Sequence, residues 1–266
     1  MGTALVAAAT LGARCAYAGT LGEDELSAFA MRRMREKGID VSPVETDAKA
    51  RPVHSFIVVD RKSGGRNIFF DPSGLVERRE FKVLEGAIRA ARVLLVDHYD
   101  IGTHIQAVRV ARKAGIPVVA DFEEDKDPHF TELLESVDHL VLSLEFAKRL
   151  CLSRSPGAIA RKLWIDGRKA VVITCGAEGC WFVTHENPAK SVHLPAFMVT
   201  AVDTTGCGDV FHGAYAAALS QGMNIAESLR FASAAAALKA LSPAGRGFPT
   251  RLEINVLLQN NGSHHQ

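Results

Sequence analysis

Four short apolar runs, separated by stretches of helical character, constrain the fold of this chain more than any other feature. The runs are RVLLVD (92–97), IPVVAD (116–121), DHLVLS (138–143) and KAVVITCG (169–176). Strands that are apolar throughout are typical of a parallel sheet that helices cover on both faces. The alternation of strand and helix therefore predicts an α/β fold, with a mostly parallel sheet sandwiched between two layers of helices.

One segment does not fit this alternation. PVHSFIVVD (52–60) and RNIFFD (66–71) both have strand character, and the turn-forming residues RKSGG lie between them. This pattern is typical of a β-hairpin. We expect the hairpin, at about residues 52–71, to form a small and incomplete lid near the carboxyl edge of the main sheet, where open α/β sheets bind ligands. All 266 residues are expected to form one domain.

Charge and cysteine content exclude several classes of protein. The 31 basic and 30 acidic residues leave a formal net charge of +1, so no overall field favours nucleic acid or a membrane surface as a partner. The five cysteines have no spacing typical of a disulfide framework. A reducing, cytoplasmic setting is therefore expected. No apolar run is long enough to span a membrane.

The stretch DTTGCGDVFHGAY, residues 203–215, carries the strongest chemical signal. Gly206, Cys207 and Gly208 have small side chains, so the backbone can turn sharply and direct several N–H groups at one point. The positive end of the following helix adds to them, and together they form an anion hole of the kind that binds phosphate. Asp209 stands where a carboxylate can accept a proton from an attacking hydroxyl. A plainer interpretation makes Asp209 only a helix-starting acid.

This stretch resembles the second signature of the PfkB, or ribokinase-like, carbohydrate kinases, and the resemblance covers nearly the whole chain. It looks closest, over 203–249, to the branch that includes sulfofructose kinase. The family usually has alanine at the position of Cys207; cysteine is small enough to fit there, and a reactive thiol is the alternative. The resemblance implies an ATP-dependent sugar kinase that uses Mg²⁺ and has Asp209 as its general base.

Two further sites follow from the resemblance. In VITCGAEGC (172–180), Thr174, Gly176 and Gly179 match the strand and glycine turn that bind the nucleotide. The pattern T-x-G-x-x-G is weak by itself, but here it precedes the anion hole by about thirty residues. A monovalent cation such as K⁺ is also implied beside the anion hole, with Asp203 on one side and the loop after the C-terminal alanine-rich helix on the other.

The chain departs from the family in two places. Members commonly carry N-x-x-E to organise magnesium, whereas this chain has Ser143 and Phe146 at those positions, and Glu145 is expected to point elsewhere. Magnesium would then be bound by phosphate oxygens, water and Asp121. The family also opens with a strand, a sugar-binding aspartate, two lid strands and a glycine pair, and Met1 aligns just after those glycines. We therefore expect an N-terminally truncated member that is weak or inactive on free sugars.

Few candidates remain for sugar binding. Asp97 and His98 follow a buried strand, at the edge where the family places a polar group that faces the sugar. An equal alternative is that Asp97 caps the next helix. The alternative function is a catalytically inactive nucleotide-binding protein of the same fold; the departures favour it and the intact GCGD opposes it. A homodimer through the lid is implied by the relatives.

Overall fold

The computed structural model describes residues 1–59, 66–151, 153–243 and 247–261. The RKSGG turn expected between the hairpin strands lies outside these ranges. The helices are α1 (Gly2–Thr10), α2 (Glu25–Glu36), α3 (Lys82–Arg89), α4 (Ile101–Lys113), α5 (Phe130–Ser136), α6 (Leu144–Cys151), α7 (Pro156–Lys162), α8 (Cys207–Ser220), α9 (Ile225–Ala240) and α10 (Arg251–Asn260), with a 3₁₀ turn η1 (Gly176–Glu178). The strands are β1 (Thr20–Leu21), β2 (Glu45–Thr46), β3 (His54–Val59), β4 (Arg66–Asp71), β5 (Leu94–Asp97), β6 (Val118–Asp121), β7 (His139–Ser143), β8 (Ala170–Thr174), β9 (Cys180–Thr184) and β10 (Val192–Leu194).

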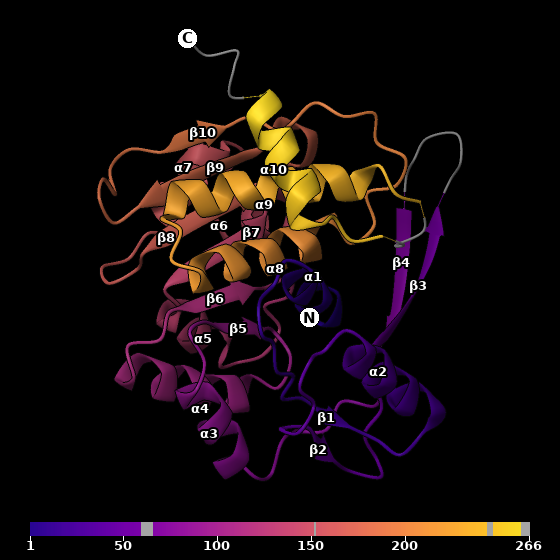
Figure 1. Ribbon diagram of the computed structural model, residues 1–266. Coiled ribbons are helices and arrows are strands. Elements are labelled where there is room, and N and C mark those ends of the chain that lie inside the picture. The colour runs from indigo at the N-terminus through magenta and orange to yellow at the C-terminus, as the bar shows by residue number, and fades with distance from the viewer. Residues whose placement is uncertain (60–65, 152, 244–246, 262–266) are drawn as a thin grey trace.

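The main sheet has the strand order β10-β9-β8-β7-β6-β5 (Figure 1). Strands β5 to β8 are parallel neighbours, and β9 and β10 extend the sheet in antiparallel fashion. Every residue of β7 and β8 except the last is buried, as strands covered on both faces require. Each of the four apolar runs contains one parallel strand, so the predicted α/β architecture is confirmed.

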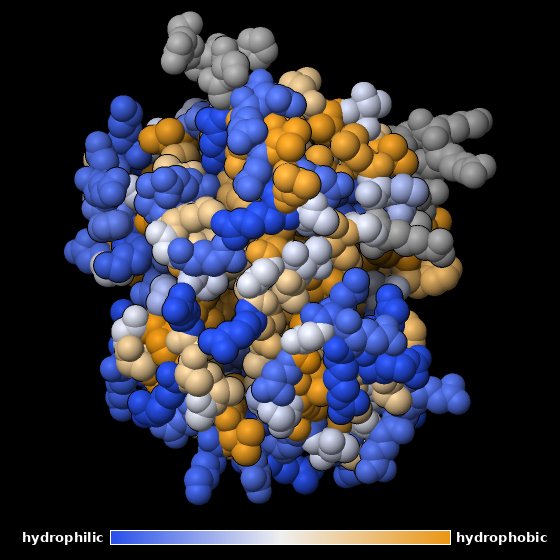
Figure 2. Space-filling view, in the orientation of Figure 1, coloured by the Kyte–Doolittle hydropathy of each residue, from blue (hydrophilic) through white to orange (hydrophobic). Residues whose placement is uncertain are grey.

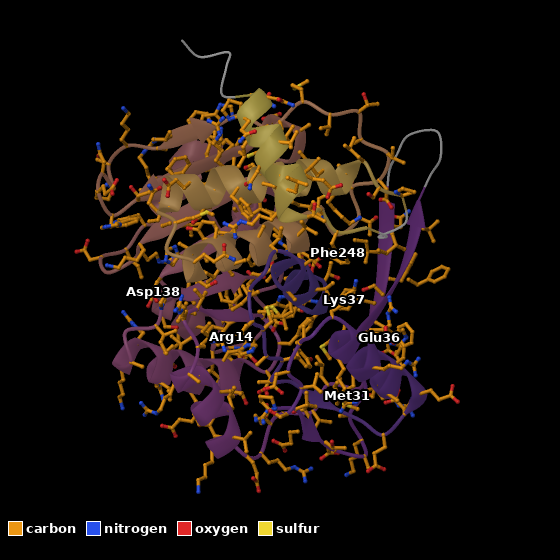
Figure 3. All side chains as sticks on the ribbon, viewed as in Figure 1. Arg14, Met31, Glu36, Lys37, Asp138 and Phe248 are labelled. Carbon is orange, nitrogen blue, oxygen red and sulfur yellow. The ribbon has the colours of Figure 1, made fainter. Side chains whose placement is uncertain are left out.

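Helices cover both faces of the sheet and form two cores. Helices α3 to α7 pack on one face, around alternate strand residues such as Ala120 and Leu142. Helices α1, α8, α9 and α10 pack on the other face, around Val119 and Val141. Successive residues of a strand point to opposite faces, so one apolar run supplies both cores. A smaller cluster joins α2 to the β1–β2 pair, and Met31 packs against it (Figure 3).

The β3–β4 hairpin forms a two-stranded sheet of its own, separate from the main sheet. In Figure 1 it projects from one side of the molecule, near α2. This confirms the hairpin that the sequence predicted outside the β-α alternation, while its function as a lid stays a prediction. Phe56 and Phe69 lie opposite each other in register and are 71% and 62% exposed.

The molecular surface carries both hydrophilic and exposed apolar side chains. Figure 2 shows hydrophilic and apolar side chains mixed over this face, with many hydrophilic ones around α2 and some apolar ones near α10. Leu252 and Val256 of α10 are among the exposed apolar residues. Within the part of the chain that the structure describes, no helix is both long and apolar enough to cross a membrane.

Candidate active site

The carboxyl ends of β5 to β8 lie next to one another along one edge of the sheet. The strand register pairs Asp97 with Asp121 and Ser143 with Thr174. Open α/β sheets bind ligands outside this edge. The fold therefore brings Asp97, predicted to bind the sugar, and Thr174, predicted to bind the nucleotide, to the same edge.

Helix α8 begins with the residues predicted to form the anion hole. Gly206 is the N-cap, and its φ of 76° lies in the left-handed region that glycine adopts without strain. Cys207 and Gly208 are the first helical residues. The first N–H groups of a helix have no acceptor within the helix, and the helix dipole favours an anion in front of them. A Cβ on Gly208 would meet nothing within 4 Å, so the space beside it is open.

His212 fixes the start of α8 to the sheet, although no sequence pattern indicated it. Its Nδ1 atom lies 2.8 Å from the Gly208 carbonyl oxygen, one turn earlier. Its Nε2 atom lies 3.1 Å from the Val141 carbonyl oxygen of β7 and 3.4 Å from Asp121 Oδ1 at the end of β6. The ring is buried. The only signal in the sequence was a polar residue within the apolar run VFHGAY.

Asp209 lies in the first turn of α8 and its side chain is 35% exposed. Burial raises the pKa of Asp209 above its ordinary value. The amine of Met1, 3.8 Å from Asp209 Oδ1, opposes this change, and the negative charge of Asp121 adds to it. Burial and the charge of Asp121 likewise raise the pKa of Glu123, just after β6. Several carboxyl groups therefore act on one another at this edge.

The described residues contain no group of three or more His, Cys, Asp or Glu side chains that could hold a metal ion. Mg²⁺ commonly binds through one or two carboxylates together with water and the phosphates of a substrate. The carboxylates of Asp121 and Glu123 fit that mode of binding, because the negative charge of Asp121 acts on Glu123 and a nearby cation would relieve that repulsion.

A hollow of about 410 Å³ opens at the ends of β7 and β8. Of the three predicted nucleotide residues, Thr174 and Gly176 line it. Gly179 does not: it has a φ of 93°, and a Cβ there would lie 2.1 Å from the Leu194 carbonyl oxygen. Gly179 therefore shapes the turn between β8 and β9, where its carbonyl oxygen accepts a hydrogen bond of 2.7 Å from Cys175 N.

Glu145 also lines this hollow, together with Ser143 and Lys148. That Glu145 does not take the place of the magnesium-organising acid stays a prediction. The Ser143 hydroxyl accepts a hydrogen bond of 3.2 Å from Phe146 N, and the Phe146 side chain is buried in the core. Phe146 therefore takes the inner side of α6, and its neighbour Glu145 is exposed.

Asp97 does not cap α4, so that alternative is wrong. The N-cap is Asp100, whose Oδ1 atom accepts a hydrogen bond of 3.3 Å from Thr103 N. Asp97 Oδ1 instead accepts from Tyr99 N at 3.0 Å. His98 Nδ1 accepts from Glu123 N at 3.3 Å, which connects the loops after β5 and β6. Both predicted sugar residues thus stay at the ligand-binding edge.

Asp203 lies in the loop that leads into α8. Its backbone N–H donates to the Ala240 carbonyl oxygen at 3.1 Å, and its Oδ1 atom accepts from Thr205 N at 2.8 Å. The loop is therefore held against the end of α9. Residues 244–246, in the loop expected to complete a monovalent-cation site with Asp203, lie outside the described ranges.

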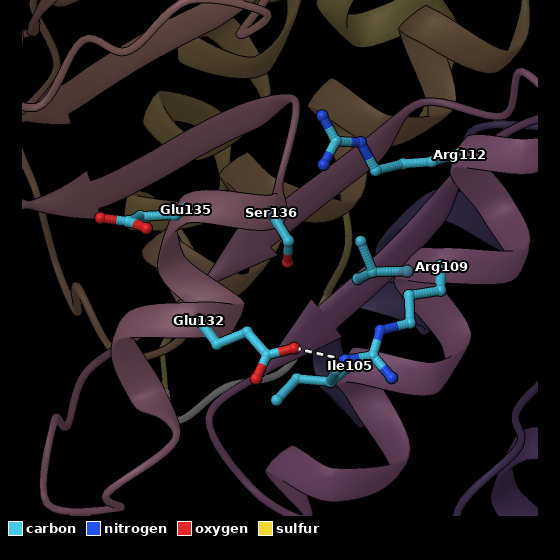
Figure 4. Close-up of a pocket in the computed structure, with 7 residues that line it drawn as sticks. Ile105, Arg109, Arg112, Glu132, Glu135 and Ser136 are labelled. Atoms are coloured by element: carbon cyan, nitrogen blue, oxygen red, sulfur yellow. Dashed lines mark hydrogen bonds and ion pairs between the residues drawn. The ribbon is translucent and has the colours of Figure 1, made fainter.

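A second hollow, of about 460 Å³, lies between α4 and α5 and contains none of the predicted site residues (Figure 4). An ion pair of 2.6 Å between Arg109 and Glu132 crosses it. Its lining residues come from α4 and α5 and not from the carboxyl ends of the strands. The hollow at β7 and β8 is therefore the better candidate for a ligand of the carboxyl edge.

Comparison with known proteins gives a consistent result. Residues 2–251 match the family model described as pfkB family carbohydrate kinase. The chain is 27% identical over 285 residues to probable fructokinase-4 of Arabidopsis thaliana, covering 96% of this chain and 85% of that protein. A putative ribokinase from Agrobacterium tumefaciens superposes with a TM-score of 0.91 at 27% identity, covering 99% and 86% of the two chains. Arabidopsis thaliana ribokinase complexed with ribose and ATP superposes with a TM-score of 0.82 at 25% identity, covering 97% and 86%.

Proposed function

Because the chain belongs to the pfkB family of carbohydrate kinases, we propose that it transfers the γ-phosphate of ATP to a sugar hydroxyl, with Asp209 as the general base. The observation that carries the proposal is the position of Asp209. It follows Gly206, Cys207 and Gly208 in the first turn of α8, on the helix that His212 fixes to β6 and β7.

The proposed reaction forms one O–P bond and breaks another. Asp209 accepts the proton of the sugar hydroxyl as the hydroxyl oxygen attacks the γ-phosphorus, and ADP leaves with the β-γ bridging oxygen. The N–H groups at the start of α8 stabilise the charge on the transferred group. Positioning and charge stabilisation supply most of the catalysis of phosphoryl transfer. The nucleotide would extend from the hollow at Thr174 and Gly176 to the start of α8.

Asp121 and Glu123 are the residues that would hold Mg²⁺, which neutralises charge on the β- and γ-phosphates when it is bound. Asp97 and His98 are the proposed sugar contacts, and the names of the relatives make fructose and ribose the first sugars to test. A K⁺ ion bound by Asp203 stays a prediction.

The proposal is tested by following ADP release from ATP in the presence of single sugars, together with calorimetry of ATP binding. We expect ATP to bind and ADP to form slowly, at a rate that depends on the sugar. ATP binding without transfer to any sugar would favour the inactive nucleotide-binding protein. Absence of ATP binding would contradict both functions.

The pH dependence of the reaction should report the environment of Asp209. A general base acts only as the carboxylate, and burial raises the pKa of Asp209 from its ordinary value of 3.8. As the pH falls, Asp209 is therefore protonated to the inactive carboxylic acid at a higher pH than an ordinary aspartate. We expect the acid limb of kcat/KM to lie above that value, with circular dichroism showing that the protein stays folded over the same range. An acid limb at the ordinary value would contradict the assignment.

We also propose that the β3–β4 hairpin joins two copies of the chain. Ile68 and Phe70 are 55% and 49% exposed in addition to the Phe56–Phe69 pair, and a two-stranded hairpin alone is only marginally stable. Replacing both Phe56 and Phe69 by serine should convert a dimer to a monomer in sedimentation velocity. Phe29→Ser, at an exposed phenylalanine of α2, is the control and should leave the dimer intact. A native protein that sediments as a monomer would refute the proposal.

A further inference from the structure

Lys239 is a buried lysine whose ammonium has no hydrogen-bond partner among the residues that the structure describes. It lies in the last turn of α9 and is 1% exposed. Charged groups in protein interiors are usually paired, because an unpaired charge loses its hydration without compensation. A buried ammonium without a hydrogen-bond partner therefore indicates that the residue has a function other than packing in the core.

The end of this side chain reaches the start of α8. A Cβ placed on Gly206 would lie 3.9 Å from Lys239 Cε and 4.0 Å from Asp209 Oδ2. The buried end of Lys239, the N-cap of α8 and the proposed general base therefore meet around one point. Lys239 is thus adjacent to the proposed anion hole from within the protein.

The backbone holds this arrangement in place. Val202 N and Asp203 N both donate to the carbonyl oxygen of Ala240, at 2.8 and 3.1 Å. Ala240 follows Lys239 directly, so the loop that leads into α8 is fastened to the turn of α9 that carries the lysine. The turn that carries the lysine and the loop that leads to the anion hole are therefore held next to each other.

We propose that Lys239 is a positioning residue whose ammonium lies beside the anion hole. The inference rests on the proposed function. The start of α8 is already the positive end of the helix dipole, so a neighbouring ammonium increases the positive potential instead of balancing it. A bound anion balances both, and the γ-phosphate of ATP is the anion that phosphoryl transfer brings there.

The first test removes the charge and keeps the length of the side chain. Lys239→Met should lower kcat by about 10²-fold, as loss of one stabilising group in an anion hole does. It should weaken ATP binding about tenfold and leave ADP binding unchanged, because only ATP carries the γ-phosphate. The thermal midpoint should not fall, since an unpaired buried charge does not stabilise a fold. Lys113→Met, at an exposed lysine in the last turn of α4, is the matched control and should behave as native.

The second test restores the charge from solution. Lys239→Ala leaves space for a small cation, and NH₄⁺ or K⁺ should restore part of its kcat, whereas tetramethylammonium should not.

Two results would overturn the inference. They are native kcat and ATP affinity in Lys239→Met, and a lowered thermal midpoint with no rescue of Lys239→Ala by cations. If the native chain phosphorylates no sugar, the proposed function fails, and the affinities for ATP and ADP still decide the role of Lys239.

Discussion

Asp209→Asn should lower kcat by about 10²- to 10⁴-fold, the usual loss when a general base is removed. The amide nearly keeps the shape of the carboxylate, but it cannot accept the proton of the sugar hydroxyl. ATP affinity should stay close to native, because the N–H groups at the start of α8 belong to the backbone and are unchanged. Steady-state kinetics give the rate, and calorimetry gives the affinity on the same preparation.

The matched control is Glu25→Gln, which changes an exposed first-turn acid of α2 in the same way. A helix-starting acid interacts with the helix dipole, and its loss costs about 0.3–1 kcal/mol of stability without a direct effect on a rate. If Asp209→Asn behaves like Glu25→Gln, with a slightly lower thermal midpoint and the native kcat, then Asp209 is only a helix-starting acid.

The parallel strands could be predicted from the sequence because a strand buried on both faces is a run of consecutive apolar residues. Each run of consecutive apolar residues became one strand of β5 to β8. The antiparallel strand β10 was missed, since it has three residues and two of them are exposed. Helix α10 was also missed, although Thr250 and Glu253 form a capping box, which the spacing T-x-x-E predicts.

The sequence located the start of α8 but not the contacts that surround it. Consecutive small residues before an acid have few uses other than a tight helix start, so Gly206 to Asp209 could be recognised. The contact between His212 and Val141 joins residues 71 positions apart, and Lys239 stands in an alanine-rich run that predicts only a helix. Local patterns do not specify which distant segments meet.

In VDHYD (96–100), too, the local pattern did not specify the structure: it did not show which of two aspartates caps the following helix. Asp97 and Asp100 both precede a helical stretch, so either fits the pattern of an N-cap. The backbone decides between them: Asp100 has a φ of 47° and caps α4, while Asp97 ends β5. A shift of three residues along the chain separates a helix cap from a candidate sugar ligand.

Gly208→Val should abolish ATP binding without unfolding the protein. A Cβ at this position would meet nothing within 4 Å, so the fold accommodates the larger side chain. The valine methyl groups would fill the space beside the first N–H groups of α8, where the phosphate is expected to lie. Calorimetry should detect no ATP binding, and the thermal midpoint should stay near native.

Valine substitutions at two other glycines serve as controls. They distinguish loss of ATP binding by a closed anion hole from loss of ATP binding by a destabilised fold. Gly86→Val in α3 also meets nothing within 4 Å, and it should bind ATP as the native chain does because Gly86 lies outside the site. Gly213→Val places a Cβ 2.0 Å from the Ala4 carbonyl oxygen, where α1 packs against α8, and it should lower the thermal midpoint. Native ATP affinity in a folded Gly208→Val protein would show that the start of α8 does not bind phosphate, and the general base would then have to be sought elsewhere along the carboxyl edge.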